Sequence, residues 1–274
     1  MTTRDDTTMT TETVRLNGID VAYTKAGSGP PVVLIHGLAE GRRSWRVVQE
    51  SLTGVTTYAY DLRGHGATTV GRPDGTLAQL RDDLLAFLEN VTGPAVCVGF
   101  SLGGTIVLSA AAHRPGLVKS VVALGTSSVV GRGAQSFYGE RIELFRGSDV
   151  EAKKAALLAD TAAALHNPES DVDAVTAARM AAVGDAHGYV NASTAMARLR
   201  DEPLTPELSR IGADVDVHII GADHDSFCPR KAAQIILDAI GHARYAEISG
   251  AGHLMLVDQP DQVVAALQQA LATA

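Results

Sequence analysis

Basic residues are scarce in this sequence of 274 residues, which has 23 Lys and Arg against 31 Asp and Glu. The net charge of −8 argues against nucleic acid and anionic membranes as partners, because both bind basic surfaces. Long apolar runs are also missing, since none approaches the roughly 20 residues that cross a bilayer. We therefore expect neither nucleic acid nor a membrane as a partner.

The amino-terminal segment and the cysteine content exclude further classes. The first eleven residues, MTTRDDTTMTT, have no apolar segment of the kind found in signal peptides, and we expect residues 1–11 to be disordered. The only cysteines are Cys97 and Cys228. Because Cys97 lies inside an apolar run, we expect a buried thiol and no disulfide, which is typical of a reducing cytoplasm.

Metal and cofactor motifs are missing too. No group of histidines and cysteines has the spacing of metal ligands, and no cofactor-binding motif is present. Asp223 and Asp225 are close together, but two carboxylates in one loop do not define a cation site. We expect a protein without metal or cofactor.

The sequence has abundant apolar residues, at 46% of the total, which is enough for a large core. Most of the predicted strands are continuous apolar runs, and helical patterns separate them, which indicates a parallel sheet covered by helices on both faces. Asn17-Gly18 predicts a hairpin that joins strands 12–16 and 19–25. The other strands are predicted over residues 31–35, 56–62, 95–100, 118–124, 215–221 and 243–249.

The alternation of strands and helices is interrupted once. From about residue 129 to 205 the chain is rich in alanine, has a helical pattern and contains no candidate strand. We predict an α/β core formed by residues 12–128 and 206–274, with a helical lid inserted over residues 129–205.

The segment Gly99-Phe100-Ser101-Leu102-Gly103 connects a predicted strand to a predicted helix. Glycines two positions to either side of Ser101 permit a sharp, strained turn that would lift the hydroxyl above the sheet. The start of the following helix would then point toward an oxyanion formed there. We predict that Ser101 is a nucleophile.

A serine nucleophile needs a general base and an acid that orients it. In chains with this turn the acid follows the serine and the base comes last. His253 lies in a glycine-rich loop after the last predicted strand and fits the base. The loop after the preceding strand offers Asp223 and Asp225; we select Asp225, because the loop must first clear the strand end, and expect Asp223 to shape the loop.

An oxyanion site needs two backbone amides. The amide of Leu102 follows the nucleophile, and Leu38 comes after the strand 31–35, where Gly37 allows close approach. We expect His36 to anchor this loop. We also expect residues 61–66, DLRGHG, to form a packed turn whose charges hold each other.

Five segments of the chain occur in the order typical of one superfamily. HGL at residue 36, DLRGHG, GFSLGG at residue 99, the Asp225 loop and GAGH at residue 250 together resemble the α/β-hydrolase superfamily from about residue 12 onward. Within it, SLGG and the segment 184–189 are similar to the 3-oxoadipate enol-lactonase branch and its esterase relatives. Epoxide hydrolases and haloalkane dehalogenases of this superfamily carry an aspartate at the turn, so Ser101 indicates acyl chemistry instead.

The predicted function is hydrolysis of carboxylic esters, with lactones preferred, through an acyl-enzyme on Ser101. Two alternatives remain open: a carbon–carbon bond hydrolase or cofactor-free perhydrolase with the same three residues, and a non-catalytic ligand receptor. Aromatic residues could line the substrate pocket, although ordinary packing would explain them equally well. The candidates are Trp45, Phe137, Tyr138, Tyr189 and Phe227.

Overall fold

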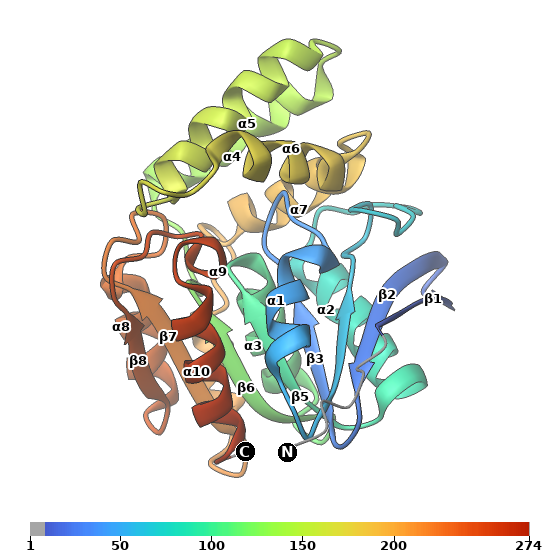
Figure 1. Ribbon diagram of the computed structural model, residues 1–274, viewed down its shortest axis with the longest axis vertical. Coiled ribbons are helices and arrows are strands. Elements are labelled where there is room, and N and C mark those ends of the chain that lie inside the picture. Colours follow the sequence, from blue (N-terminus) through green and yellow to red (C-terminus); the bar gives the residue numbers. More distant parts are fainter. Residues whose placement is uncertain (1–8, 274) are drawn as a thin grey trace, which may run out of the picture.

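An eight-stranded sheet forms the centre of the protein in a computed structural model, which describes residues 9–273 (Figure 1). The strand order is β1-β2-β4-β3-β5-β6-β7-β8. The neighbours β1, β2 and β4 run antiparallel, and every pair from β4 to β8 is parallel. The strands are β1 (Thr10–Leu16), β2 (Ile19–Gly27), β3 (Pro31–Ile35), β4 (Thr56–Tyr60), β5 (Ala95–Phe100), β6 (Val118–Leu124), β7 (Asp216–Ala222) and β8 (Arg244–Ile248).

The predicted amino-terminal hairpin is confirmed. Asn17 and Gly18 both have positive φ, 46° and 76°, as a two-residue turn of this kind requires, and Leu16 pairs with Ile19. The first strand begins at Thr10, earlier than expected, so the last two residues of the segment predicted to be disordered pair with β2. Residues 1–8 of that segment lie outside the described residues.

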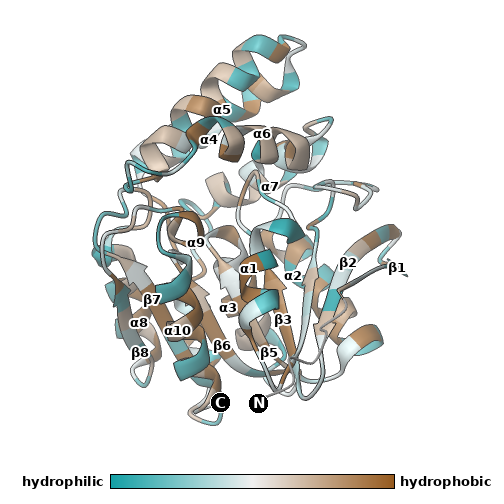
Figure 2. Ribbon diagram, in the orientation of Figure 1, coloured by the Kyte–Doolittle hydropathy of each residue, from teal (hydrophilic) through white to brown (hydrophobic). Residues whose placement is uncertain are grey.

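Helices cover both faces of the sheet, as the continuous apolar strands predicted (Figure 1). Hydropathic colouring follows this arrangement, with the central strands brown and the outer helix faces partly teal (Figure 2). One face packs against α2 (Leu77–Phe87), α3 (Leu102–His113) and α8 (Arg230–Ile240). The other face packs against α1 (Arg46–Ser51) and α10 (Pro260–Leu271).

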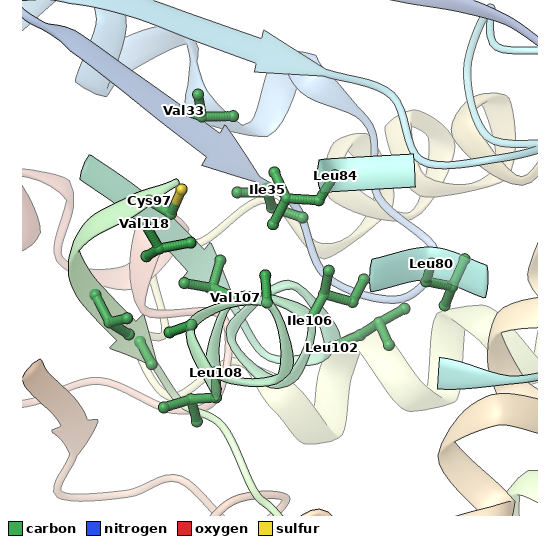
Figure 3. Packing of buried hydrophobic residues seen from close by; sticks show 14 of the residues in the cluster. Val33, Ile35, Leu80, Leu84, Cys97, Leu102, Ile106, Val107, Leu108 and Val118 are labelled. Atoms are coloured by element: carbon green, nitrogen blue, oxygen red, sulfur yellow. The ribbon is translucent and has the colours of Figure 1, made fainter. Parts of the chain in front are cut away.

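The helix α3 follows the serine turn and is buried along almost its whole length. Ile106 and Val107 lie in one apolar cluster with Val33 and Ile35 of β3 (Figure 3). Complete burial of such side chains contributes about 1.5–3 kcal/mol each. The start of α3 is therefore held firmly above the sheet.

The segment after β3 contains two short helical turns. A 3₁₀ turn, η1 (Arg42–Trp45), precedes the short helix α1, and the Ser44 hydroxyl donates to the carbonyl of Gly41 (3.0 Å). Cys97 is buried and carries a free thiol, as expected.

Four helices lie between β6 and β7, over the carboxyl ends of the strands (Figure 1). They are α4 (Arg132–Arg146), α5 (Val150–Ala164), α6 (Val172–Val183) and α7 (His187–Arg198). Asp149 and Asp171 cap α5 and α6 by accepting backbone amide hydrogen bonds. Short helices η3 (Thr205–Arg210) and α9 (Met255–Asp258) and the π turn η2 (Leu88–Thr92) complete the fold. None of the helices within residues 9–273 combines the length and apolar character that a membrane crossing requires.

Candidate active site

Ser101 stands at the junction of β5 and α3 with φ 53° and ψ −118°, a region that side chains rarely occupy. A Cβ on Gly99 would overlap the backbone of Gly103, and one on Gly103 would overlap the carbonyl of Ile35. The two glycines therefore let β3, β5 and α3 meet closely around the serine. The strained turn inferred from the sequence is confirmed.

The structure brings Ser101, Asp225 and His253 together from the ends of three strands. His253 lies after β8 and Asp225 after β7, at the same edge of the sheet as Ser101. The imidazole Nε2 is 3.0 Å from Ser101 Oγ, and Nδ1 is 2.8 Å from Asp225 Oδ2. These are hydrogen-bond distances, so the imidazole can link the carboxylate to the hydroxyl.

Asp225 is buried and fully engaged. Its Oδ2 faces His253, and its Oδ1 accepts from the amides of Phe227 (2.9 Å) and Cys228 (2.8 Å). Burial opposes ionisation, but the His253 charge and hydrogen bond, with the two amides, hold the pKa of Asp225 below its usual value. The carboxylate is therefore fixed in orientation beside the imidazole.

Asp223 points to the neighbouring loop, where it accepts hydrogen bonds from Ser249 Oγ (3.0 Å) and the amides of Gly250 (2.9 Å) and Ala251 (3.2 Å). The Gly250 amide is the main cause that lowers the pKa of Asp223 to about 2. These contacts agree with the expected loop-shaping role, because the loop they hold carries His253.

Asp258 holds the same loop from the other side and was not singled out in the sequence. Its buried carboxylate accepts from the amides of Gly252 (2.8 Å), His166 (2.8 Å) and Asn167 (3.2 Å). His166 and Asn167 follow α5, so this one side chain joins the lid to the His253 loop. Nothing in the sequence near Asp258 signals such a contact.

The two residues whose amides were expected to bind an oxyanion are both near Ser101: Leu102 follows it, and Leu38 lines the same cavity. Leu102 is the first residue of α3, and Leu38 lies in the loop after β3. Neither amide donates a hydrogen bond to another residue within 9–273, whereas the adjacent Gly37 amide donates to Glu40 Oε2 (3.2 Å). Both amides are thus available to a ligand at Ser101.

His36 anchors this loop through both ring nitrogens. Its Nε2 accepts from the Leu62 amide (2.8 Å), so Nδ1 donates to the Gly37 carbonyl (2.8 Å). Burial lowers the pKa of His36, which keeps the ring neutral in this arrangement. The contacts agree with the structural role expected for His36.

The turn at residues 61–66 is packed as expected, but its charges do not hold each other. Asp61 pairs with Arg42 of η1, and Arg63 pairs with Asp83 of α2 (2.6 Å). The side chains of the turn diverge and bind different elements. The expectation of an internal ion pair was therefore wrong.

A cavity of about 50 Å³ adjoins Ser101 and His253 beneath the lid. Four of the five predicted aromatic residues line it, together with Leu38; they are Phe137, Tyr138, Tyr189 and Phe227. Phe137 of α4 lies against Phe227 of the acid loop, with ring centroids 6.2 Å apart, and Phe227 stacks on His253 at 5.3 Å. The lid thus contacts the imidazole indirectly, through Phe227.

Trp45 does not line this cavity. Its side chain is fully buried between the sheet and α1, in a cluster with Val32, Leu34 and Val48. The 3₁₀ turn before α1 directs the indole toward the sheet and away from the lid. The substrate contact suggested for Trp45 is corrected accordingly.

Charged lid residues near the site were missed in the sequence. Arg179 of α6 lines the Ser101 cavity, and its Nη1 donates to Thr161 Oγ1 (2.7 Å). Asp160 of α5 also lines it and is held by both arms of Arg141 (2.8 and 2.6 Å). A signal for Arg179 did exist, because it is the only basic residue in the apolar segment VDAVTAARMAAV.

These features define a class. The sequence profile of the family described as the alpha/beta hydrolase fold matches residues 30–260. The chain belongs to this family and is a hydrolase of that fold, which confirms the resemblance inferred from its motifs.

Particular relatives span nearly the whole chain. Pyrrolizixenacetamide deacetylase of Xenorhabdus hominickii is 26% identical over 263 residues, which cover 94% of this chain and 97% of that protein. A hydrolase from Pseudomonas aeruginosa PA01 superposes with a TM-score of 0.83 at 26% identity, covering 95% and 98% of the two chains. The enol-lactonase from Burkholderia xenovorans LB400 superposes with a TM-score of 0.81 at 23% identity, covering 95% and 100%, and shares the fold.

Proposed function

We propose that the protein is a serine hydrolase of carboxylic esters, with lactones preferred, and that Ser101, His253 and Asp225 are its catalytic residues. The observation that carries this proposal is the continuous hydrogen-bonded series from Asp225 through His253 to Ser101 Oγ. A serine needs such a base to become nucleophilic at neutral pH. The aromatic cavity beside it suits a small organic acyl group.

The proposed reaction has two halves. Ser101 Oγ attacks the ester carbonyl while His253 Nε2 takes the hydroxyl proton, and the Leu38 and Leu102 amides bind the negative oxygen. The carbon–oxygen bond to the alcohol then breaks, and His253 returns the proton to the leaving oxygen. Water, deprotonated by His253, attacks the acyl-enzyme, and the carboxylic acid leaves as Ser101 regains its proton.

The preference for lactones rests on two considerations. A neighbour with the same fold is an enol-lactonase, and a relative of similar length is a deacetylase. Lactone opening and deacetylation, both acyl-transfer reactions, are thus named for similar proteins. In a lactone the alcohol stays attached to the acyl group and can close the ring again. Phe227 over His253, with Phe137 of the lid packed against it, would hold that alcohol away until water attacks.

The experiment is proton release in a pH-stat on a panel of lactones and linear esters. Ser101→Ala and Asp225→Asn are expected to lower kcat by about 10²–10⁴-fold or more. Asp223→Asn is the matched control in the same loop, and it should lower kcat by no more than about tenfold. Turnover that survives in Ser101→Ala would refute the mechanism.

The same panel separates the alternatives. Rapid opening of lactones favours the lactonase reading, and rapid hydrolysis of linear esters alone favours a simple esterase. A protein that releases at most one equivalent of acid on every substrate would instead be a ligand receptor, and the proposal would fail.

A further inference from the structure

A second cavity, much larger than the one at Ser101, lies under α6. We name it the α6 chamber; its volume is about 450 Å³, within the range of small-molecule sites, whereas the Ser101 cavity of about 50 Å³ holds a few water molecules. The smaller cavity alone cannot enclose an ester with a substantial substituent. The α6 chamber is lined by residues 40–44, Asp61, Gly66, Ala67, Val175, Ala178, Arg179, Ala181, Ala182 and Val257.

Arg179 lines both cavities and therefore separates them. Apart from the bond to Thr161, its guanidinium is poorly satisfied: Nε is buried and has no hydrogen-bond partner within residues 9–273. Burial lowers the pKa of Arg179, an effect that the charge of Glu40 opposes. Arg179 is half-buried, and its buried Nε favours an anion nearby, because leaving a buried polar group without a partner is costly.

The carboxylates around Arg179 are committed elsewhere. Asp160 is held by both arms of Arg141, and Glu40 accepts the Gly37 amide. In the part of the chain that the structure describes, neither carboxylate comes within 4.0 Å of the Arg179 nitrogens to form an ion pair. A place for an external carboxylate thus remains at the boundary of the two cavities.

The rest of the α6 chamber is mainly small and apolar. Val175, Ala178 and Ala182 of α6 face Val257 of α9 across it. Arg42, at its inner wall, is already neutralised by Asp61. The chamber therefore suits an apolar group attached close to the anion that Arg179 would bind.

We propose that Arg179 binds a carboxylate on the substrate and that the α6 chamber receives an apolar substituent carried beside that carboxylate. The inference rests on the proposed function, since it names the substrate class of the same site: an ester or lactone that bears both a carboxylate and a bulky apolar group. Arg179 is then a specificity-determining residue that the sequence motifs do not include.

Charge recognition is tested with p-nitrophenyl monoesters of succinic, glutaric and adipic acid, each paired with its methyl-capped neutral counterpart. The ratio of kcat/KM for the anionic over the neutral ester should fall by about 10- to 100-fold in Arg179→Met. Arg179→Lys should recover part of the ratio, because it restores the positive charge. An unchanged ratio in Arg179→Met would overturn the carboxylate assignment.

The chamber is tested with the same monoesters bearing an octyl branch. Ala178→Phe places a ring in the chamber, and the preference for branched over unbranched esters should fall about tenfold or more. Ala177→Phe is the matched control, because Ala177 and Ala178 are both exposed and only Ala178 lines the chamber. Equal effects of the two substitutions would overturn the chamber assignment.

A binding measurement distinguishes failure of this inference from failure of the proposed function. Octylsuccinate is titrated calorimetrically into Ser101→Ala, with and without Arg179→Met. Binding that requires Arg179, in a wild-type protein that hydrolyses no ester, would refute the proposed function and support the site. Ester hydrolysis by the wild type, without binding of octylsuccinate that requires Arg179, would support the proposed function and refute the Arg179 site.

Discussion

At the scale of single residues, the serine turn stores strain that its neighbours hold in place. The Ser101 amide donates to the Leu124 carbonyl (2.8 Å), and the Ser101 carbonyl accepts from Thr126 Oγ1 (2.7 Å) and the Thr105 amide (3.2 Å). Such a backbone conformation costs about 1–3 kcal/mol for a residue with a side chain. The three hydrogen bonds persist without the hydroxyl, so the turn should survive its removal.

Ser101→Gly is accordingly expected to increase the free energy of unfolding by about 1 kcal/mol, because glycine accepts φ 53° without strain. Ser101→Ala, which keeps the Cβ, should leave it nearly unchanged. Urea denaturation of the two variants measures the difference. If both variants match the wild type, the turn is unstrained.

The contribution of Asp223 to folding stability should depend on pH. Its pKa in the folded protein, about 2, lies below its ordinary value of 3.8, so the ionised carboxylate favours folding. This contribution is complete above about pH 4 and disappears as pH falls toward 2. Denaturant midpoints of wild type and Asp223→Asn should therefore differ at pH 6 and converge near pH 2. A difference that stays constant with pH would contradict the assignment.

Sequence reasoning found the residues that follow strand ends and missed those that depend on lid packing. Ser101, Asp225 and His253 were predictable because carboxyl ends of parallel strands meet at one edge of the sheet. Arg179 was not selected, since its place beside Ser101 depends on how α6 packs over the core. Trp45 was misplaced for a related reason: a 3₁₀ turn, invisible in the pattern, sets its direction.

At the scale of elements, the lid meets the core through two glycines. A Cβ on Gly188, at the start of α7, would overlap the backbone of Gly64 in the turn after β4. Nearby, the Gly66 amide donates to the Ala182 carbonyl at the end of α6 (2.8 Å). The backbones of lid and core are therefore in direct contact at this point.

Gly188→Ala should separate these backbones and lower the free energy of unfolding by about 1–3 kcal/mol. Gly139→Ala is the control within the lid, because Gly139 is exposed in α4 and has open space around its Cα. It should instead stabilise the protein by about 0.5–1 kcal/mol through helix propensity. Thermal unfolding of both variants measures the contrast, and a stabilised Gly188→Ala would show that the contact is unimportant.

Element boundaries were predicted best where burial is continuous. The strands β3, β5 and β6 have the expected bounds, because all three are mainly apolar and almost completely buried. The short helices η1, η3 and α9 gave no periodic signal, since one or two turns are too short to show one.

At the scale of the whole molecule, the sequence predicted the positions of the strands along the chain and a single helical insertion. The continuous apolar runs show which strands are buried on both faces. Strands of this kind indicate a parallel sheet covered by helices, which is the α/β class. The orientation of the lid could not be predicted in the same way. Its alanine-rich helices α5 and α6 have side chains too uniform to distinguish an inner from an outer face.

The inserted helices leave and re-enter the core at neighbouring points. The Leu204 amide donates to the Ser128 carbonyl (2.8 Å), and the hydroxyls of Ser128 and Thr205 are 2.7 Å apart. Because the core already holds these two ends together, exchanging the segment between them adds little loop-closure entropy. The segment from residue 129 to 203 could thus be replaced by other helical hairpins. Such chimeras would have new substrate selectivity above an unchanged serine turn.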